Sequence, residues 1–288
     1  MRLRIGILGA KGQLGNDLVK ALAHHQVISF TRADFDVAET EKARAALVEV
    51  RPDVLINTTA YHRVDDCEGQ PELAYSVNVL SVLNLIRVVN ELEAQLVHFS
   101  TDYVFDGAAA YPYTEDSAAM PLSVYGNSKL AGEYLVRSIA RRYILIRTCG
   151  LYGVAGSRGK GGNFVETMLA KARAGDNIRV VADQVVTPTY TADLAQQVAL
   201  MLDSGASGLF HVTNEGACSW YEFAQAIFDL AKVNANLSPT SSDLYKTPAI
   251  RPKYSVLENA RLKQLSLNRM THWREALASY LHEKQIRG

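Results

Sequence analysis

The sequence contains few cysteines, and their spacing marks neither a disulfide framework nor a metal site. Only Cys67, Cys149 and Cys218 occur in 288 residues. An odd number of widely separated cysteines fits neither paired disulfides nor the short spacing of zinc ligands. We therefore expect three free thiols in a reducing compartment, and we predict no metal site.

Excess charge and long apolar runs are also absent. Thirty basic residues balance thirty acidic ones, so the formal net charge is zero. A neutral chain gives no electrostatic signal for nucleic acid or for an anionic membrane surface. The apolar stretch after Met1 reaches glycine too soon for a signal peptide, and no other run is expected to span a bilayer. We expect a cytoplasmic protein whose partner is a small molecule, with no role for nucleic acid or membrane.

What the sequence does contain is an alternation of apolar runs and helical patterns, which begins with a glycine-rich turn. Residues 3–8 form an apolar run, a helical pattern follows, and Gly9, Gly12 and Gly15 between them form G-x-x-G-x-x-G. Glycine lets such a turn tighten, lets backbone N–H groups approach a pyrophosphate and lets the helix pack on the strand. The pattern predicts a dinucleotide site at the first strand–helix junction.

A second strand is predicted at residues 27–30, and Thr31 and Arg32 follow it. In a Rossmann-type fold the chain meets the adenosine ribose at this point. A basic side chain suits the 2′-phosphate of NADP(H), whereas an acid would suit the free hydroxyl of NAD(H). Arg32 therefore favours NADP(H), with NAD(H) as the alternative cofactor and an exposed loop arginine as the alternative interpretation.

Further strands are predicted at residues 53–57, 96–102, 143–147 and 209–212, and a long helix at about 72–92. This alternation indicates a parallel sheet with right-handed crossovers. We predict an α/β fold, a Rossmann-type doubly wound parallel sheet with a smaller, interleaved C-terminal substrate-binding lobe. The expected dinucleotide-binding part is residues 1–150 with a return segment near 178–212. The expected lobe is residues 151–177 and 213–288.

A phenol and an ammonium lie one helical turn apart at Tyr125 and Lys129, with Ser123 upstream as a candidate N-cap. A cation beside a phenol is expected to lower the phenol pKa from about 10, so that the pair could exchange a proton with a substrate oxygen. The helix is expected to bury one apolar side and to present one polar stripe. The apolar side is Ala131, Leu135 and Ile139, and the polar stripe is Tyr125, Lys129 and Glu133.

Taken together, these residues resemble the extended short-chain dehydrogenase/reductase family, and within it the dTDP-4-dehydrorhamnose reductases. The matching motifs extend over most of the chain in the family's order. They are Gly9-x-x-Gly12-Gln13-Leu14-Gly15, Asn57-x-x-Ala60-Tyr61-x-x-Val64-Asp65, Ser100-Thr101-Asp102-Tyr103-Val104-Phe105-Asp106-Gly107, Val124-Tyr125-Gly126-x-x-Lys129, Asn163-Phe164-Val165, Asp183-Gln184-x-x-x-Pro188-Thr189-Tyr190 and Ser219-Trp220-Tyr221-Glu222-Phe223.

The resemblance implies NADP(H)-dependent reduction of the 4-keto group of a nucleotide-activated 6-deoxysugar, with dTDP-4-dehydro-L-rhamnose as the substrate. Tyr125 would give a proton to the keto oxygen as hydride arrives from the nicotinamide. Lys129 would hold the nicotinamide ribose and lower the phenol pKa, and the Thr101 hydroxyl would bond the same keto oxygen. The further cofactor contacts implied are Gly9, Gly12, Gln13, Leu14, Gly15, Arg32, Asp36, Val37, Ala60 and Tyr61. The further substrate contacts implied are Val64, Asp102, Gly150, Asn163 and Arg251, the last toward the diphosphate.

One position departs from the resembled family, which usually has tryptophan where this chain has Gly150. That ring is thought to pack against the sugar, so its loss could remove roughly a few kcal/mol of substrate burial unless another side chain fills the space. Trp220 is expected in the core and not at a ligand. Arg158 and Lys160 belong either to a flap over a diphosphate or to a plain surface loop, and the charged residues after Tyr61 are assigned no chemistry.

Two other functions stay open beside this one. The first is a related sugar-nucleotide reductase or epimerase with a different hexose, because of Gly150. The second is a non-catalytic, cofactor-binding regulatory subunit, since relatives of these reductases serve as partners of methionine adenosyltransferase. The sequence leaves the oligomeric state undecided, with a homodimer as one possibility.

Overall fold

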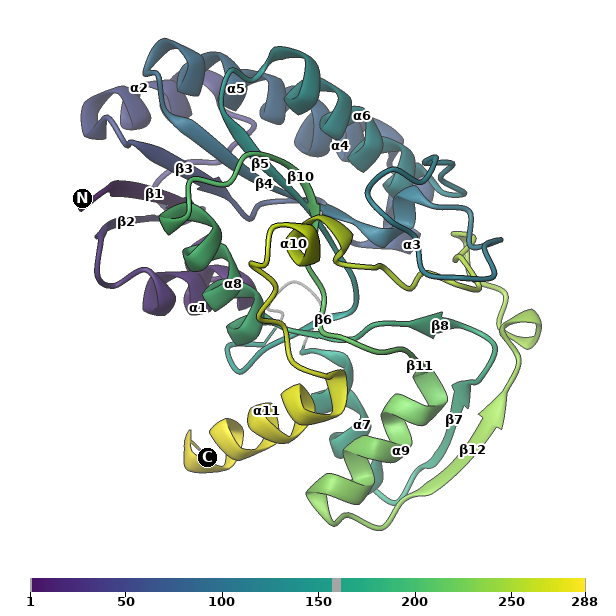
Figure 1. Cartoon of the computed structure of the whole chain (residues 1–288). Coiled ribbons are helices and arrows are strands. Elements are labelled where there is room, and N and C mark those ends of the chain that lie inside the picture. The colour runs from purple at the N-terminus through teal and green to yellow at the C-terminus, as the bar shows by residue number, and fades with distance from the viewer. Residues whose placement is uncertain (1, 157–161, 288) are drawn as a thin grey trace.

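In the computed structural model, which describes residues 2–156 and 162–287, a six-stranded parallel sheet carries helices on both faces and a smaller lobe at one end (Figure 1). The strands lie in the order β10-β5-β4-β3-β1-β2. Their bounds are β1 Arg4–Leu8, β2 Gln26–Phe30, β3 Val54–Asn57, β4 Gln95–Thr101, β5 Tyr143–Thr148 and β10 Gly208–His211. Because β2 and β3 lie on opposite sides of β1, the winding reverses there, which is where open α/β sheets bind ligands. The predicted Rossmann-type doubly wound sheet is confirmed.

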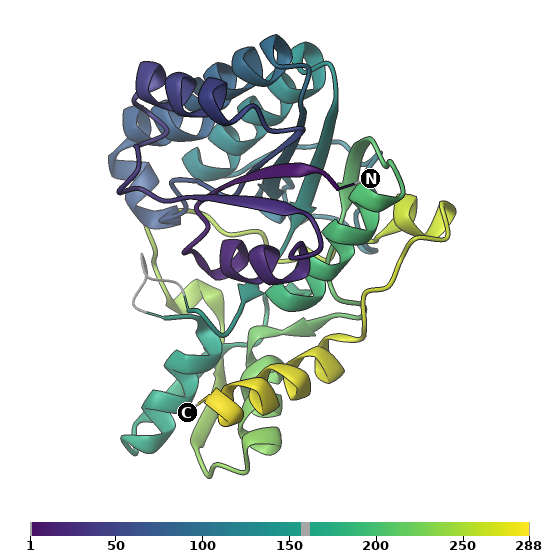
Figure 2. The same ribbon diagram turned by 90° about the vertical axis from the view of Figure 1, so that its left-hand side faces the viewer.

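Each face of the sheet is buried by its own set of helices, as the side view in Figure 2 shows. Ile5 and Ile7 of β1 point to one face, and Leu55 of β3 and Leu96 of β4 point to the other. Side chains alternate along a strand, so a strand between two helical layers must be apolar throughout. The first face is covered by α1 Gln13–Ala21 and α8 Thr191–Asp203, and the second by α2 Thr40–Val50, α5 Ser81–Glu91 and α6 Val124–Ile139.

The long crossover helix corrects one expectation from the sequence. Residues 71–91 form one continuous helical segment, composed of α4 Pro71–Tyr75, the π-helical turn η1 Ser76–Leu80 and α5. An 18-residue window of this 21-residue segment has a mean hydropathy of 1.4, so by length and composition the segment could cross a membrane, which the sequence-based prediction had excluded. Its Leu85 and Ile86 instead pack on the sheet in the core described above.

The smaller lobe has its own apolar core, and the interleaving predicted from the sequence is confirmed. It is built from α7 Phe164–Arg173, β7 Asn177–Val181, α9 Trp220–Ala231, β12 Asn236–Thr240 and α11 Trp273–Arg287. Since β7 pairs with β12 and buries Ile178 in the lobe, the predicted return segment begins too early. The chain returns to the sheet with α8, not at residue 178.

The chain passes between the sheet and the lobe several times. After α8 and β10 it enters the lobe as α9, and it then returns to the sheet with α10 Ala260–Gln264. Leu262 and Met270 are buried in the same core as α1 and α8, before α11 ends the chain in the lobe. The remaining short elements join the two parts or line their junction. They are α3 Val64–Gly69, η2 Asp102–Val104, β6 Leu151–Tyr152 paired with β9 Thr189–Tyr190, β8 Val185–Val186 paired with β11 Cys218–Ser219, and η4 Ser242–Leu244.

Candidate active site

A large cavity opens at the carboxyl ends of the central strands, between the sheet and the lobe. Its volume of about 1250 Å³ exceeds the roughly 300–1,000 Å³ typical of a pocket for one drug-sized ligand. Every site residue predicted from the sequence lines it except Gly15. Among the described lining residues, Lys11, Arg32, Lys129 and Arg251 outnumber the carboxylates Asp36 and Asp102. The cavity therefore has room for two ligands and favours negative charge.

The glycine turn leads from β1 into α1, with Gly12 as the helix N-cap. Gly9 has a left-handed φ of 77°, which glycine adopts without strain. A Cβ on Gly15 would lie 2.2 Å from the Gly9 carbonyl oxygen, which explains why Gly15 packs helix on strand without reaching the cavity. Gly9 and Gly12 thus expose backbone at a helix N-terminus, the arrangement that fits the pyrophosphate of a dinucleotide.

The loop after β2 places Arg32, Asp36 and Val37 at the edge of the same cavity. The Arg32 guanidinium is 89% exposed and lies 2.8 Å from an Asp36 carboxylate oxygen. An exposed pair of this kind contributes little to stability. The arginine can therefore turn to another anion at small cost, as a 2′-phosphate contact would require.

The loop after β3 is held by a buried amide that sequence reasoning missed. Asn78 lies in the π-helical turn η1, and its Oδ1 accepts a hydrogen bond from the Tyr61 N–H at 2.9 Å. Its Nδ2 donates to the Tyr61 carbonyl oxygen at 3.0 Å and to the Ser128 hydroxyl at 2.9 Å. Asn78 thereby fixes Tyr61 and Ala60 against α6. The signal available in the sequence was a polar residue within an apolar helix.

Helix α6 begins as predicted, but its polar stripe is buried. The Ser123 hydroxyl accepts from the Gly126 N–H at 3.2 Å, which confirms the N-cap. The polar stripe is the buried side, since Lys129 is 2% and Glu133 0% exposed, whereas Ile139 is 41% exposed. The reason is that the sheet supplies polar partners for the stripe.

These partners come from β4 and β5. The Lys129 Nζ donates to the Phe99 carbonyl oxygen at 2.7 Å. Glu133 forms a bidentate ion pair with Arg147, with 2.7 Å between Oε2 and Nη2, and also accepts from the Ser100 hydroxyl. Buried charges persist only when they are paired and hydrogen-bonded. The network locks α6, and with it Tyr125, onto the end of the sheet.

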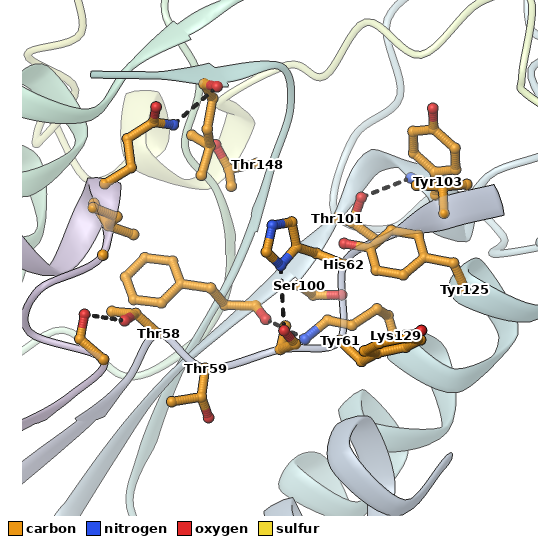
Figure 3. Close-up of a pocket in the computed structure, with 18 of the residues that line it drawn as sticks. Thr58, Thr59, Tyr61, His62, Ser100, Thr101, Tyr103, Tyr125, Lys129 and Thr148 are labelled. Carbon is orange, nitrogen blue, oxygen red and sulfur yellow. Dashed lines mark hydrogen bonds between the residues drawn. The ribbon is translucent and has the colours of Figure 1, made fainter. Parts of the chain in front are cut away.

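Figure 3 shows Tyr125, Thr101 and Lys129 directed into the cavity. Burial raises the pKa of Tyr125 above its usual value of 10, and a hydrogen bond with Thr101 only partly opposes this effect. Burial therefore outweighs the lowering of the phenol pKa that was predicted from Lys129, whose ammonium donates to the Phe99 carbonyl oxygen. Burial lowers the pKa of Lys129 itself to about 8. Tyr125 is thus a neutral phenol, which is the form that can donate a proton.

Asp102 stands behind Thr101 with its carboxylate surrounded by donors. The Thr101 hydroxyl donates to its Oδ1 at 3.0 Å, the Cys149 thiol donates to its Oδ2 at 3.2 Å, and the Ser255 hydroxyl also bonds it. Burial raises the pKa of Asp102, while these hydrogen bonds lower it. The sequence placed Asp102 at the substrate but did not identify Cys149 and Ser255, because their positions follow from tertiary contacts alone.

Arg251 reaches the cavity from the C-terminal part of the chain. Its guanidinium forms two hydrogen bonds with Asp65, at 2.7 and 3.1 Å. Asp65 lies in α3 beside Val64, the predicted substrate contact that also lines the cavity. The sequence assigned Asp65 no chemistry, and the structure gives its carboxylate an ion pair with the predicted diphosphate contact.

Asn163 lines the cavity, yet the protein already uses its side chain. Its Oδ1 accepts from the Glu166 N–H as the N-cap of α7. Its Nδ2 donates to the Gly153 carbonyl oxygen at 3.0 Å and lies 3.4 Å from the Gln13 side-chain amide oxygen. The Gln13 Nε2 in turn donates to the Leu151 carbonyl oxygen. Asn163 and Gln13 thus join the lobe to the glycine turn.

Two predictions about the lobe side of the cavity have different outcomes. Trp220 was expected in the core, but it is only partly buried and lines the cavity together with Phe164. Gly150 lines it as predicted, with a left-handed φ of 56°. The suggested flap cations, Arg158 and Lys160, lie outside the described residues.

The structure also brings together a group that the sequence did not flag as metal-like. His24, His25 and Asp203 place their ligand atoms within 4.8 Å of one another, away from the cavity. The Leu3 N–H donates to His25 Nδ1 at 3.4 Å, and His25 Nε2 lies 3.3 Å from an Asp203 carboxylate oxygen.

The chain is similar to a known protein family, to curated proteins and to solved structures. The family described as "RmlD substrate binding domain" matches residues 3–286. Spore coat polysaccharide biosynthesis protein SpsK of Bacillus subtilis is 39% identical over 283 residues, covering 98% of both chains. A dTDP-4-dehydrorhamnose reductase structure from Clostridium acetobutylicum is 39% identical with a TM-score of 0.93, covering 98% of this chain and 99% of that one. The Bacillus anthracis dTDP-4-dehydrorhamnose reductase in complex with NADP is 35% identical with a TM-score of 0.93, covering 98% of this chain and 100% of that one.

Proposed function

This chain belongs to the RmlD substrate binding domain family, and from that membership we propose that it is an NADP(H)-dependent dTDP-4-dehydrorhamnose reductase. It reduces the 4-keto group of a nucleotide-activated 6-deoxysugar, giving dTDP-L-rhamnose from dTDP-4-dehydro-L-rhamnose. The observation that carries the proposal is a neutral, partly buried phenol, Tyr125, in one cavity with Thr101, Lys129 and a glycine turn.

The cofactor site is formed by the glycine turn and by the loops after β2 and β3. Gly9 and Gly12 present backbone to the pyrophosphate, and Arg32 turns from Asp36 to the 2′-phosphate of NADP(H). When bound, the dinucleotide supplies the hydride that reduces the ketone. The Lys129 ammonium, already held by the Phe99 carbonyl oxygen, has two remaining N–H groups for the ribose of the nicotinamide.

Tyr125 supplies the proton. The reduced carbonyl carries developing negative charge on its oxygen, and a positioned general acid lowers the barrier by donating to that oxygen. Because burial raises the pKa of Tyr125, the phenol stays protonated until negative charge develops on the keto oxygen. Positive charge from Lys129 then stabilises the phenolate that remains, since opposite charges attract strongly away from bulk water.

Thr101 and Asp102 orient the carbonyl. The Thr101 hydroxyl donates to Asp102 in the ligand-free protein, and a rotation of this hydroxyl brings a second donor to the keto oxygen. Asp102 retains the Cys149 and Ser255 donors when Thr101 turns away, so its carboxylate is not left unsatisfied.

The remainder of the cavity serves the nucleotide diphosphate of the substrate. We assign this contact to Arg251, because its guanidinium is held in position by two hydrogen bonds to the Asp65 carboxylate. We further propose that residues 1–150 with α8 and β10 bind the dinucleotide and that the lobe binds the sugar nucleotide. A cytoplasmic location and a homodimer complete the proposal, with no membrane or nucleic-acid partner, and the zero net charge supports the last point.

The test is NADPH oxidation, followed as loss of absorbance, with dTDP-4-dehydro-L-rhamnose as the acceptor. Tyr125→Phe should lower kcat by roughly 10²- to 10⁴-fold while NADPH binding is retained, because only the proton donor is removed. Tyr134→Phe is the matched control, since Tyr134 lies on the same helix but is 56% exposed to solvent. Turnover of Tyr125→Phe near the wild-type rate would refute the assigned role.

A second candidate function is reduction or epimerisation of a different nucleotide hexose, and Gly150 is the observation that favours it. A panel in which the nucleotide and the sugar are varied separately discriminates between the two. The non-catalytic regulatory role would require NADPH binding without turnover of any ketosugar in this panel, together with capture of a methionine adenosyltransferase partner.

A further inference from the structure

Trp220 is held rigidly at the mouth of the lobe. It is the first residue of α9, directly after the N-cap Ser219, whose hydroxyl and backbone N–H form a capping box with Glu222. Its ring lies 4.8 Å from the Phe164 ring and 6.2 Å from the Phe223 ring, between centroids. A capped helix start and two aromatic neighbours leave the indole little freedom to move.

The edge of this indole meets the end of β5. The Trp220 Cη2 atom lies 3.6 Å from the position a Cβ would take on Gly150. Gly150 has no side chain that could bound the cavity there. A larger residue at this position would be strained, because the φ is left-handed and the Cβ would lie 3.2 Å from the Pro188 Cα. Trp220 therefore occupies the space next to Gly150 with a ring from another part of the chain.

This place is at the reacting end of the cavity. Gly150 follows Cys149, whose thiol donates to Asp102, and Asp102 in turn accepts from Thr101 beside Tyr125. The sugar carbon that accepts hydride must lie next to Tyr125 and Thr101. The dinucleotide enters from the glycine turn on β1, whereas Trp220 comes from the lobe, so the ring faces the sugar and not the nicotinamide.

We infer that Trp220 is the wall on which the sugar ring of the substrate packs, which makes it a specificity residue for the reaction. The inference rests on the proposed function, because it takes the ligand to be a sugar nucleotide. The apolar C–H face and the 6-methyl group of a deoxyhexose suit the face of an indole, while its hydroxyls would turn to the cavity's polar side. Phe164 lines the cavity beside the indole and packs against it, with 4.8 Å between the ring centroids.

The chain offers a clean optical test, since it has two tryptophans, Trp220 and Trp273. Trp273 is buried in the lobe core against Phe223 and does not line the cavity. Trp273→Phe therefore gives a protein whose indole emission reports Trp220 alone. Titration with dTDP-L-rhamnose should shift or quench this emission, whereas dTDP alone, which lacks the sugar, should leave it unchanged.

Kinetics in the Trp273→Phe background supply the second measurement. Trp220→Ala should raise KM for the ketosugar roughly 10- to 100-fold, the range expected when a hydrophobic contact is lost, with KM for NADPH unchanged. Trp220→Phe should restore part of the loss, because a smaller ring still offers a flat face. It also keeps the test decisive if Trp220→Ala does not fold.

Two results would overturn the inference while the proposed function stands. One is normal ketosugar turnover with KM of the Trp220 variants within twofold of the parent. The other is an emission change that dTDP alone reproduces, which would place the base and not the sugar on the indole. If no ketosugar is turned over by the parent protein, the proposed function fails, and the emission titration still decides whether Trp220 contacts a sugar.

Discussion

The buried ion pair between Glu133 and Arg147 gives the sharpest stability prediction. Glu133→Gln keeps the shape of the side chain but removes its charge. It also replaces one acceptor oxygen with an NH₂ group that faces an Arg147 donor, at a position where Oε2 and Nη2 are 2.7 Å apart. The guanidinium, only 2% exposed, would then be a buried charge without its counter-ion.

The size of the effect follows from this burial. Removing one partner of a buried pair costs about 3–5 kcal/mol, because the remaining charge is neither solvated nor paired. At about 2–4 °C per kcal/mol for chains of 150–250 residues, Tm should fall by on the order of 10 °C. The control is Asp116→Asn, because the oxygen–nitrogen distance of 2.8 Å between Asp116 and Arg261 is nearly the same as the 2.7 Å of the buried pair, but the two side chains are 81% and 38% exposed. An exposed pair contributes about 0–1 kcal/mol, so this control should remain close to wild type.

Urea unfolding with linear extrapolation measures the free energy of unfolding of both variants. A Glu133→Gln loss within 1 kcal/mol of the Asp116→Asn loss would refute the reasoning. The double variant Glu133→Leu with Arg147→Met supplies a second check. Because neither charge is then buried, it should recover much of the stability that either single variant loses.

Two further predictions concern the cofactor site. Gly15→Ala should weaken NADPH binding and lower the stability, because the added Cβ would lie 2.2 Å from the Gly9 carbonyl oxygen. The control is Gly69→Ala, whose Cβ meets no atom within 4 Å. This control should change neither NADPH affinity in binding titrations nor Tm in melting curves. Burial lowers the pKa of Lys129 from 10.5 to about 8, so kcat/KM should fall as pH rises through 8 and the ammonium is lost. Between pH 8 and pH 10.5 the unfolded chain holds the Lys129 proton and the folded protein does not, so the free energy of unfolding should rise with pH in this range. A kcat/KM profile and a stability profile that both stay flat to pH 10 would contradict the two predictions for Lys129.

Local chemistry made much of the fold and site predictable. Apolar runs ending in glycine, the Ser123 cap and the Tyr125–Lys129 spacing depend on residues close in sequence, and the structure places them as expected. The burial of the polar stripe of α6 was not predicted, because Glu133 can be buried only through its ion pair with Arg147, which lies on a separate strand. A pattern of polar and apolar residues cannot show that a polar stripe has a buried partner elsewhere.

The same limit explains the residues that were missed. Asn78, Cys149 and Ser255 act through contacts with distant positions in the chain, from 17 residues between Asn78 and Tyr61 to 106 residues between Cys149 and Ser255 and more between Ser255 and Asp102, and no local motif marks such pairings. Trp220 was expected in the core, and its ring does pack against the lobe core, but it also lines the cavity. Only the tertiary arrangement shows that it lies beside Gly150.

The repeated passage of the chain between sheet and lobe also determines when this protein can fold during its synthesis. Leu262 and Met270 belong to the core beneath α1 and α8, so the unit of β1 and α1, which is translated long before them, keeps part of its apolar face uncovered until residue 270 has been made. Such distant contacts slow folding and leave apolar surface exposed to aggregation. We therefore expect the nascent chain to depend on chaperones, and nonsense truncations before residue 270 to yield no partly active fragment.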